Sequence, residues 1–227
     1  MGPDFRVGIY YCPSEDDPLF IAGATWLGRD PATGAALEQP DIPGIAEVTA
    51  EARGYGFHAT LKPPMRLAAG RSWDGLLDAT RAVAARIEPF ELPSLAVHDL
   101  HGFLALRETE PCAALQALAD VCVIELDEFR AAPSEAELAR RRHARLSETQ
   151  DAMLLRFGYP YVLATSFFHM TLTRRLSETE HRKWRPETER YLAAATAERR
   201  MVTDICLFTQ AAAGAPFVIE ARVPLRG

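Results

Sequence analysis

The stretch Phe57-His58-Ala59-Thr60-Leu61-Lys62 returns in the second half of the chain as Phe168-His169-Met170-Thr171-Leu172-Thr173. Successive side chains of a β-strand point to opposite faces, so each copy, as a strand, has one apolar and one polar face. The polar faces carry His58, Thr60 and Lys62 in the first copy, and His169, Thr171 and Thr173 in the second. Side by side, two such strands would gather two imidazoles and two hydroxyls around one small space.

A single His-x-Thr in a strand is usually a half-buried histidine beside an ordinary threonine. Its repetition, with Phe before and Leu after it both times, favours a functional site. Histidine titrates near neutral pH, so one imidazole can take a proton from water while the other protonates a departing alkoxide. Thr60 and Thr171 would hydrogen-bond the non-bridging oxygens of a phosphate. We therefore predict His58, Thr60, His169 and Thr171 as catalytic residues, with the order of the two histidines left open.

Four further residues are predicted to bind the substrate. Lys62 and Thr173 share the polar faces of the two copies, and Lys62 would neutralise phosphate charge. Tyr10 belongs to a predicted strand, residues 5–11, from which it could face the site, although a strand tyrosine more often packs at a rim. Arg130 precedes an arginine-rich segment and is a candidate phosphate contact.

The repeated motif resembles the 2H phosphoesterase superfamily, which has one His-x-Thr/Ser motif in each of two pseudo-symmetric lobes. Residues 55–64 and 168–173 are similar to its branch associated with phosphonate metabolism and carbon–phosphorus lyase. The resemblance covers most of the chain, but residues 164–166 read Ala-Thr-Ser where that branch often has acidic and aromatic residues. It implies metal-independent opening of a cyclic phosphodiester, with a five-membered cyclic phosphate on ribose as the substrate.

Composition narrows the class of protein. With 48% hydrophobic and 25% charged residues the chain resembles an ordinary globular protein, and its net charge of −6 disfavours duplex nucleic acid as a partner. The sequence has no apolar run of membrane-spanning length, no signal peptide and only four scattered cysteines, so we expect a cytoplasmic protein without membrane contact. It has no Gly-rich phosphate loop or metal-ligand cluster, so we expect no cofactor and no metal. The oligomeric state stays open.

The predicted elements indicate an α+β fold with a single domain over residues 1–227. The resemblance implies two pseudo-symmetric lobes with facing antiparallel sheets, one His-x-Thr strand from each, and helices outside. Residues 13–54, rich in Pro and Gly, form either a lid or substrate loop, or a surface excursion pinned by Trp26. Further predictions are a strand at 121–126, one helix over 134–157 and a helix from 177 that is interrupted near Pro186.

These observations predict a metal-independent phosphoesterase that opens a small ribose cyclic phosphate from phosphonate breakdown. Three alternatives remain: a phosphodiesterase for RNA ends with 2′,3′-cyclic phosphate, a non-catalytic nucleotide- or phosphate-binding module, and a metallohydrolase around His98 and His101. The acidic net charge favours a compact phosphorylated sugar or nucleotide over a long polyanion.

Overall fold

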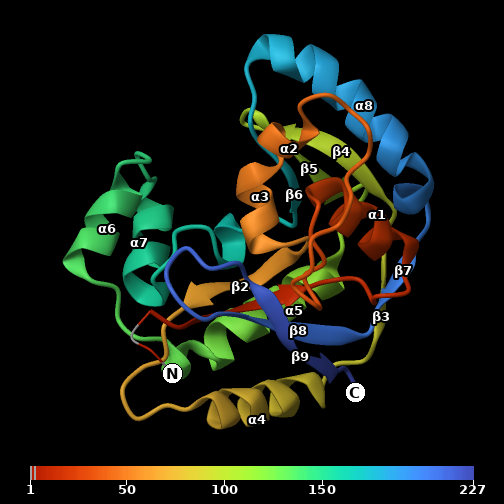
Figure 1. The fold of residues 1–227 in the computed structure, drawn as a ribbon. Coiled ribbons are helices and arrows are strands. Elements are labelled where there is room, and N and C mark those ends of the chain that lie inside the picture. Colours follow the sequence, from red (N-terminus) through yellow and green to blue (C-terminus); the bar gives the residue numbers. More distant parts are fainter. Residues whose placement is uncertain (1, 3) are drawn as a thin grey trace.

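The computed structural model describes residue 2 and residues 4–227, which form an α+β fold built on antiparallel sheets, as predicted. The larger sheet has seven strands in the order β4-β5-β6-β2-β1-β8-β9, and the smaller one pairs β3 with β7 (Figure 1). The strands are β1 (Arg6–Tyr11), β2 (Ala59–Met65), β3 (Phe90–Leu92), β4 (Leu95–Leu100), β5 (Phe103–Glu108), β6 (Met170–Arg175), β7 (Arg200–Val202), β8 (Asp204–Gln210) and β9 (Val218–Pro224).

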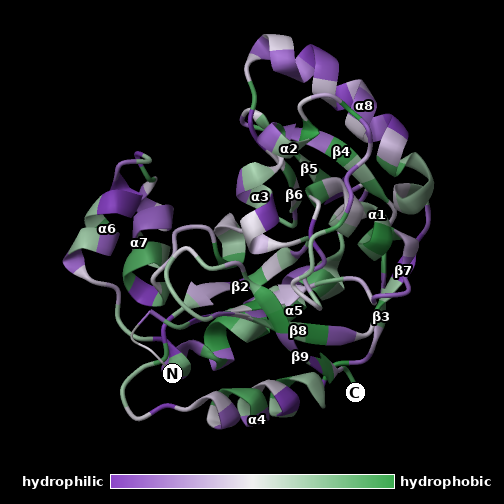
Figure 2. Ribbon diagram, in the orientation of Figure 1, coloured by the Kyte–Doolittle hydropathy of each residue, from purple (hydrophilic) through white to green (hydrophobic). Residues whose placement is uncertain are grey.

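Helices surround the larger sheet, and Figure 1 shows α6 and α7 standing apart from the rest at one side. The charged residues of α6 and α8 give these two helices hydrophilic surfaces, whereas α5 and β8 are largely apolar (Figure 2). The α-helices are α1 (Pro18–Leu27), α2 (Ile45–Val48), α3 (Ala50–Tyr55), α4 (Trp73–Ala84), α5 (Ala113–Glu125), α6 (Glu135–Arg142), α7 (Glu148–Phe157) and α8 (Glu178–Ala197), with 3₁₀ turns η1 (Asp127–Phe129) and η2 (Leu163–Thr165). None of the helices in this part of the chain combines the length and apolar character that crossing a bilayer requires.

The two motif strands are neighbours in the middle of the larger sheet. β2 and β6 pair antiparallel through Ala59 and Met170, the residues that directly follow the two histidines. This pair joins β4-β5-β6 to β2-β1-β8-β9, so the strands form one continuous sheet and differ from the two facing sheets expected from the sequence. The junction of the two strand groups is therefore also the meeting point of the motifs.

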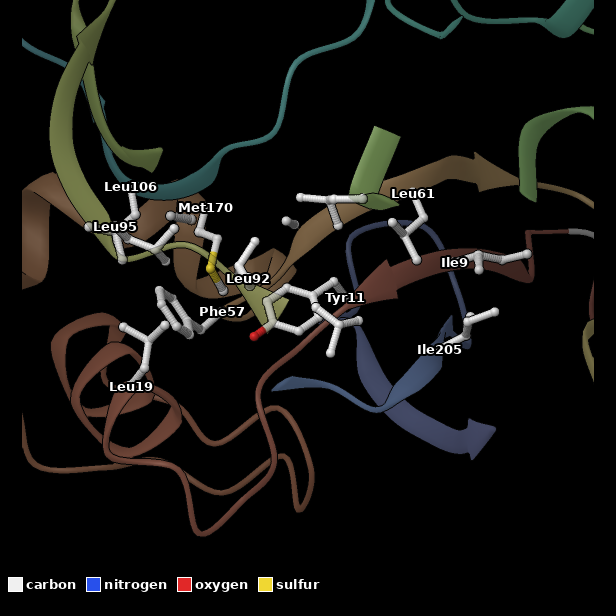
Figure 3. Close-up of a cluster of buried hydrophobic side chains, with 14 of the residues drawn as sticks. Ile9, Tyr11, Leu19, Phe57, Leu61, Leu92, Leu95, Leu106, Met170 and Ile205 are labelled. Carbon is white, nitrogen blue, oxygen red and sulfur yellow. The ribbon is translucent and has the colours of Figure 1, made fainter. Parts of the chain in front are cut away.

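A hydrophobic core lies against the motif strands and holds them in place. Phe57 and Met170 are fully buried, and Figure 3 shows them close to Tyr11 within a cluster of apolar side chains. The buried Trp26 of α1 donates its indole N–H to the carbonyl of Leu172 on β6, at 3.0 Å. Residues 13–54 therefore contribute three helices and a core anchor rather than an irregular excursion alone.

Three predicted elements differ in the structure. The strand expected at 121–126 is the end of α5, since buried Cys122 and Val123 continue the apolar face of that helix. The helix expected over 134–157 is divided into α6 and α7, because Ser147 forms a second capping box after Arg145 takes a left-handed φ of 52°. Conversely, α8 runs through Pro186 without interruption.

Candidate functional site

The register between β2 and β6 brings the four motif residues together. Ala59 and Met170 are paired and buried, so the antiparallel ladder sets His58 opposite Thr171, and Thr60 opposite His169. Alternation directs these four side chains to the face away from Ala59 and Met170. Thr60 is exposed, and the other three are partly exposed.

Both histidines have the same local hydrogen bond. The Nδ1 atom of His58 lies 2.9 Å from the carbonyl oxygen of Gly56, and that of His169 lies 3.1 Å from the carbonyl oxygen of Phe167. A carbonyl oxygen only accepts, so Nδ1 carries the proton of each neutral ring. Nε2 is then the unprotonated nitrogen in both rings, which suits it to accept a proton from a ligand.

His58 lies in an aromatic environment. The ring of Tyr10, on β1, stacks on it with a centroid distance of 3.8 Å and an interplanar angle of 22°, and the Phe208 ring lies 5.6 Å away. The pKa of His58 is lowered to about 4, mainly by burial, with a smaller contribution from the nearby charge of His169. The structure therefore packs the buried ring of Tyr10 against His58 and makes His58 neutral at pH 7.

His169 has a different neighbour, Arg107 on β5. Ala105 pairs with Thr171 and Leu106 with Met170, so Arg107 follows on the same face beside His169. Burial lowers the pKa of His169, and the positive charge of Arg107 lowers it too. No local sequence pattern marks Arg107 as a site residue, because only the pairing of β5 with β6 places it beside His169.

Lys62 and Thr173 do not lie on the polar faces predicted for them. Lys62 is buried, and its ammonium group donates to the carbonyl of Val123 and to Asp127, each at 3.0 Å. The buried Thr173 hydroxyl accepts the backbone N–H of Leu104 at 2.9 Å. Both residues are therefore structural ties between elements.

A β-bulge after each motif explains these two errors. On β2, Thr60 pairs with Tyr10 but Lys62 pairs with Ile9, so Leu61 is an extra residue. On β6, Thr171 pairs with Ala105 but Arg175 pairs with Phe103, so extra residues stand between them. A bulge changes the alternation of side chains, so Lys62, beyond the bulge on β2, and Thr173, within the irregular stretch of β6, leave the predicted face.

Arg130, His98 and His101 also have definite places. Arg130 forms a two-point ion pair with Asp127, at 2.8 and 2.9 Å, and lines a cavity beside α6. His98 is exposed on β4, and His101 is exposed in the turn before β5. Within residues 2 and 4–227, no group of three or more His, Cys, Asp and Glu side chains is arranged to hold a metal ion.

Residues 60–218, more than half of the chain, match the family described as "Protein of unknown function (DUF1045)". The chain is 40% identical to a ribose 1,5-bisphosphate phosphokinase PhnN from Janthinobacterium sp., over 98% of the chain and 51% of that protein. It is 31% identical to a protein of the same name from Laribacter hongkongensis, over 93% of the chain and 50% of that protein. The chain thus spans about half the length of these curated relatives.

Among solved structures, the chain is similar to E. coli LigT in its apo form, with 15% identity, full coverage of both chains and a TM-score of 0.45. It is also similar to LigT complexed with 3′-AMP, with 15% identity, 99% coverage of both chains and the same TM-score.

The relatives' names overturn the predicted activity. The sequence predicts a hydrolase that opens a cyclic phosphodiester, whereas both curated relatives are named as phosphokinases. A phosphokinase transfers a phosphoryl group to its substrate and hydrolyses no diester. The assignment of this chain as a cyclic phosphodiesterase is therefore corrected.

Proposed function

Because the chain belongs to the DUF1045 family and its curated relatives are named for a ribose bisphosphate, we propose that it binds a phosphorylated ribose on the sheet face that the two His-x-Thr strands share. The observation that carries the proposal is the set of four motif side chains on one sheet face, with both histidines holding Nε2 unprotonated. The resemblance to 2H phosphoesterases supports a phosphate ester as the ligand class.

The chemistry of the four side chains suits a phosphate. Two threonine hydroxyls can donate to its oxygens, and each imidazole becomes a donor once Nε2 takes a proton. Arg107 adds a positive charge beside His169, and its buried Nε has no hydrogen-bond partner among the described residues. An anion here would satisfy that donor and raise the pKa of both histidines, so binding should draw protons onto the protein.

The proposal concerns the ribose phosphate and not a phosphoryl donor. The sequence has no Gly-x4-Gly-Lys-Ser/Thr loop, the usual cradle for nucleotide phosphates. The phosphokinase name belongs to proteins about twice as long as the matched region. Within residues 1–227 we assign one domain, in which each strand group contributes one His-x-Thr motif to a shared site.

The test is calorimetric titration with ribose 5-phosphate, with ribose as the ligand that lacks phosphate. Losing one charge-assisted hydrogen bond costs about 1.5–3 kcal/mol, so His58→Asn and His169→Asn should each weaken binding by roughly 10- to 100-fold. His143→Asn, at the exposed end of α6, is the matched control and should leave affinity unchanged. Repeating the titration at pH 7 in two buffers of different ionisation enthalpy should reveal proton uptake.

Two results would contradict the proposal. One is equal binding of ribose and ribose 5-phosphate, because the phosphate would then make no contribution. The other is wild-type affinity in both motif variants once circular dichroism has shown that they are folded.

A further inference from the structure

A cavity of about 390 Å³ lies between α6 and one end of the central strands β1 and β2, apart from the His-x-Thr motifs. Its walls come from α6, the start of β1, the end of β2 and the turn between β8 and β9, which extends toward α6 and α7 in Figure 1. This volume is in the range typical of small-molecule sites, about 300–1,000 Å³. The cavity holds none of the four motif residues.

Arginines dominate this cavity. Five line it, against two carboxylates, those of Asp4 and Glu137. This concentration of positive charge stands out in a chain whose net charge is −6. The five are Arg6, Arg66, Arg130, Arg140 and Arg141.

Two of the arginines are neutralised by partners within the protein. Arg66 pairs with Glu137 at 2.9 Å, and Arg130 pairs with Asp127. In the described part of the chain, the other three form no ion pair with a carboxylate. The cavity thus holds three guanidinium groups outside any ion pair, and Asp4 is the remaining carboxylate in its wall to offset them.

These three guanidinium groups are near enough to interact, and aromatic rings hold two of them in place. Arg141 lies over the ring of Tyr159, with its Cζ atom 4.5 Å from the ring centroid. Arg6 lies over the Phe217 ring at 5.5 Å and donates its Nε–H to Gln210 at 2.7 Å. Burial lowers the pKa of Arg141, and the charges of Arg140 and Arg6 lower it further. Aromatic stacking fixes the planes of these groups without consuming their charge.

We propose that this arginine cavity binds a phosphate group of a small phosphorylated molecule, at a site separate from the His-x-Thr motifs. Guanidinium groups bind phosphate through paired, charge-assisted hydrogen bonds, and an anion would relieve the repulsion among Arg6, Arg140 and Arg141. A long polyanion would meet the acidic remainder of the surface. The ligand class is therefore a compact phosphate monoester or pyrophosphate.

The experiment uses the full chain carrying His58→Asn and His169→Asn, so that phosphate binding at the motif strands is removed. Inorganic phosphate and pyrophosphate are titrated by calorimetry, with ribose 5-phosphate as a third ligand. We expect pyrophosphate to bind this variant, and Arg141→Gln added to it to weaken binding by roughly tenfold or more. Arg142→Gln is the matched control, because exposed Arg142 lies on the same helix but pairs with Asp151 at 2.7 Å; it should change affinity less than twofold, roughly the size of a surface effect.

Each other outcome has a defined meaning. If none of the three ligands binds this variant at concentrations up to about 10 mM, an affinity too weak for a specific site, the proposal that the arginine cavity binds phosphate is wrong. Equal losses from Arg141→Gln and Arg142→Gln would also overturn it, because they would indicate only general surface charge. Loss of all pyrophosphate binding on removal of the two histidines would assign the anion to the motif strands instead. Tighter binding of an oligoribonucleotide than of pyrophosphate at physiological salt would replace the small ligand with a nucleic acid.

The test of the arginine cavity and the test of the proposed ribose phosphate site can fail independently of each other. Failure at the arginine cavity leaves titrations of His58→Asn and His169→Asn unaffected. Failure at the motif strands leaves pyrophosphate binding and its dependence on Arg141 intact.

Discussion

His58 and His169 have the same local geometry in different surroundings. Each is followed at once by a motif strand, and each donates Nδ1–H to the carbonyl two residues before it. Around them, however, His58 lies under the ring of Tyr10, whereas His169 lies beside Arg107. The repeated sequence thus sets the tautomer of both rings, and the non-repeated neighbours set how readily each takes a proton.

The largest expected effect comes from changing the residues whose carbonyls accept the two Nδ1–H hydrogen bonds, Gly56 for His58 and Phe167 for His169. Gly56 has φ 77° and ψ 170°, a region that is essentially restricted to glycine, and a Cβ there would lie 2.9 Å from Cβ of Pro31. Phe167 is exposed and does not have a positive φ. We expect Gly56→Ala to lower the free energy of unfolding by about 1–3 kcal/mol, the usual cost of such backbone strain. Phe167→Ala should change it by about 0.5 kcal/mol or less, as for other surface positions. Urea denaturation measures both.

Ligand binding gives the control for this prediction. Gly56→Ala should also weaken binding of ribose 5-phosphate, because the carbonyl that orients His58 moves with the strained backbone. Equal stability and equal affinity in Gly56→Ala and the wild type would show that this carbonyl does not position His58.

The second prediction concerns acid stability. The pKa of His58 is about 4 in the folded protein, below its ordinary value of about 6.5 in the unfolded chain. Between these two pH values the unfolded chain binds a proton that the folded protein does not. The contribution of neutral His58 is therefore complete above pH 6.5 and is lost as the pH falls toward 4.

A comparison of variants isolates that contribution. Between pH 7 and pH 5, His58→Gln should lose about 2 kcal/mol less unfolding free energy than the wild type, because glutamine does not titrate. His169→Gln should show the same sign, since burial lowers that pKa as well. Carboxylates contribute equally in all three proteins, so the difference reports the histidines. If the unfolding free energy of His58→Gln falls between pH 7 and pH 5 as steeply as that of the wild type, the pKa of His58 is the same in the folded protein and the unfolded chain.

From the sequence, the placement of the four motif residues on one sheet face could be predicted, but that of the residues around them could not. Alternation is a local property of an extended strand, and it holds up to the first irregularity. His58 and Thr60 precede the bulge on β2, and they lie on the predicted face. Lys62 follows that bulge and points instead to the partly buried Asp127.

The irregularities themselves depend on strand partners distant in sequence. The bulge on β2 is defined against β1, and that on β6 against β5, so no local pattern reveals either. Arg107 reaches His169 through the same β5–β6 pairing. The α+β class follows from local elements, whereas the joining of both strand groups into one sheet rests on the single pair Ala59 and Met170.

The smallest predicted effect is a change in the pKa of one histidine when its own neighbour is replaced, without a change in the pKa of the other. Arg107→Gln removes a positive charge beside His169, so the pKa of His169 should rise toward its ordinary value while that of His58 stays the same. Tyr10→Leu is the mirror variant. It opens the stacked face of His58, so the pKa of His58 should rise from about 4 and that of His169 should not follow.

Proton NMR titration of the imidazole Cε1 signals resolves the two rings in one experiment, with His58→Gln and His169→Gln assigning the signals. Lys183→Gln is the control for the loss of one positive charge, because Lys183 is exposed on α8 and donates to the carbonyl of Pro43. Should Arg107→Gln shift both signals equally, as Lys183→Gln would if only net charge mattered, Arg107 would act through the overall field. A shift confined to His169 would instead identify Arg107 as the neighbour that makes this histidine different from His58, because a short-range charge acts most strongly on the ring that it adjoins.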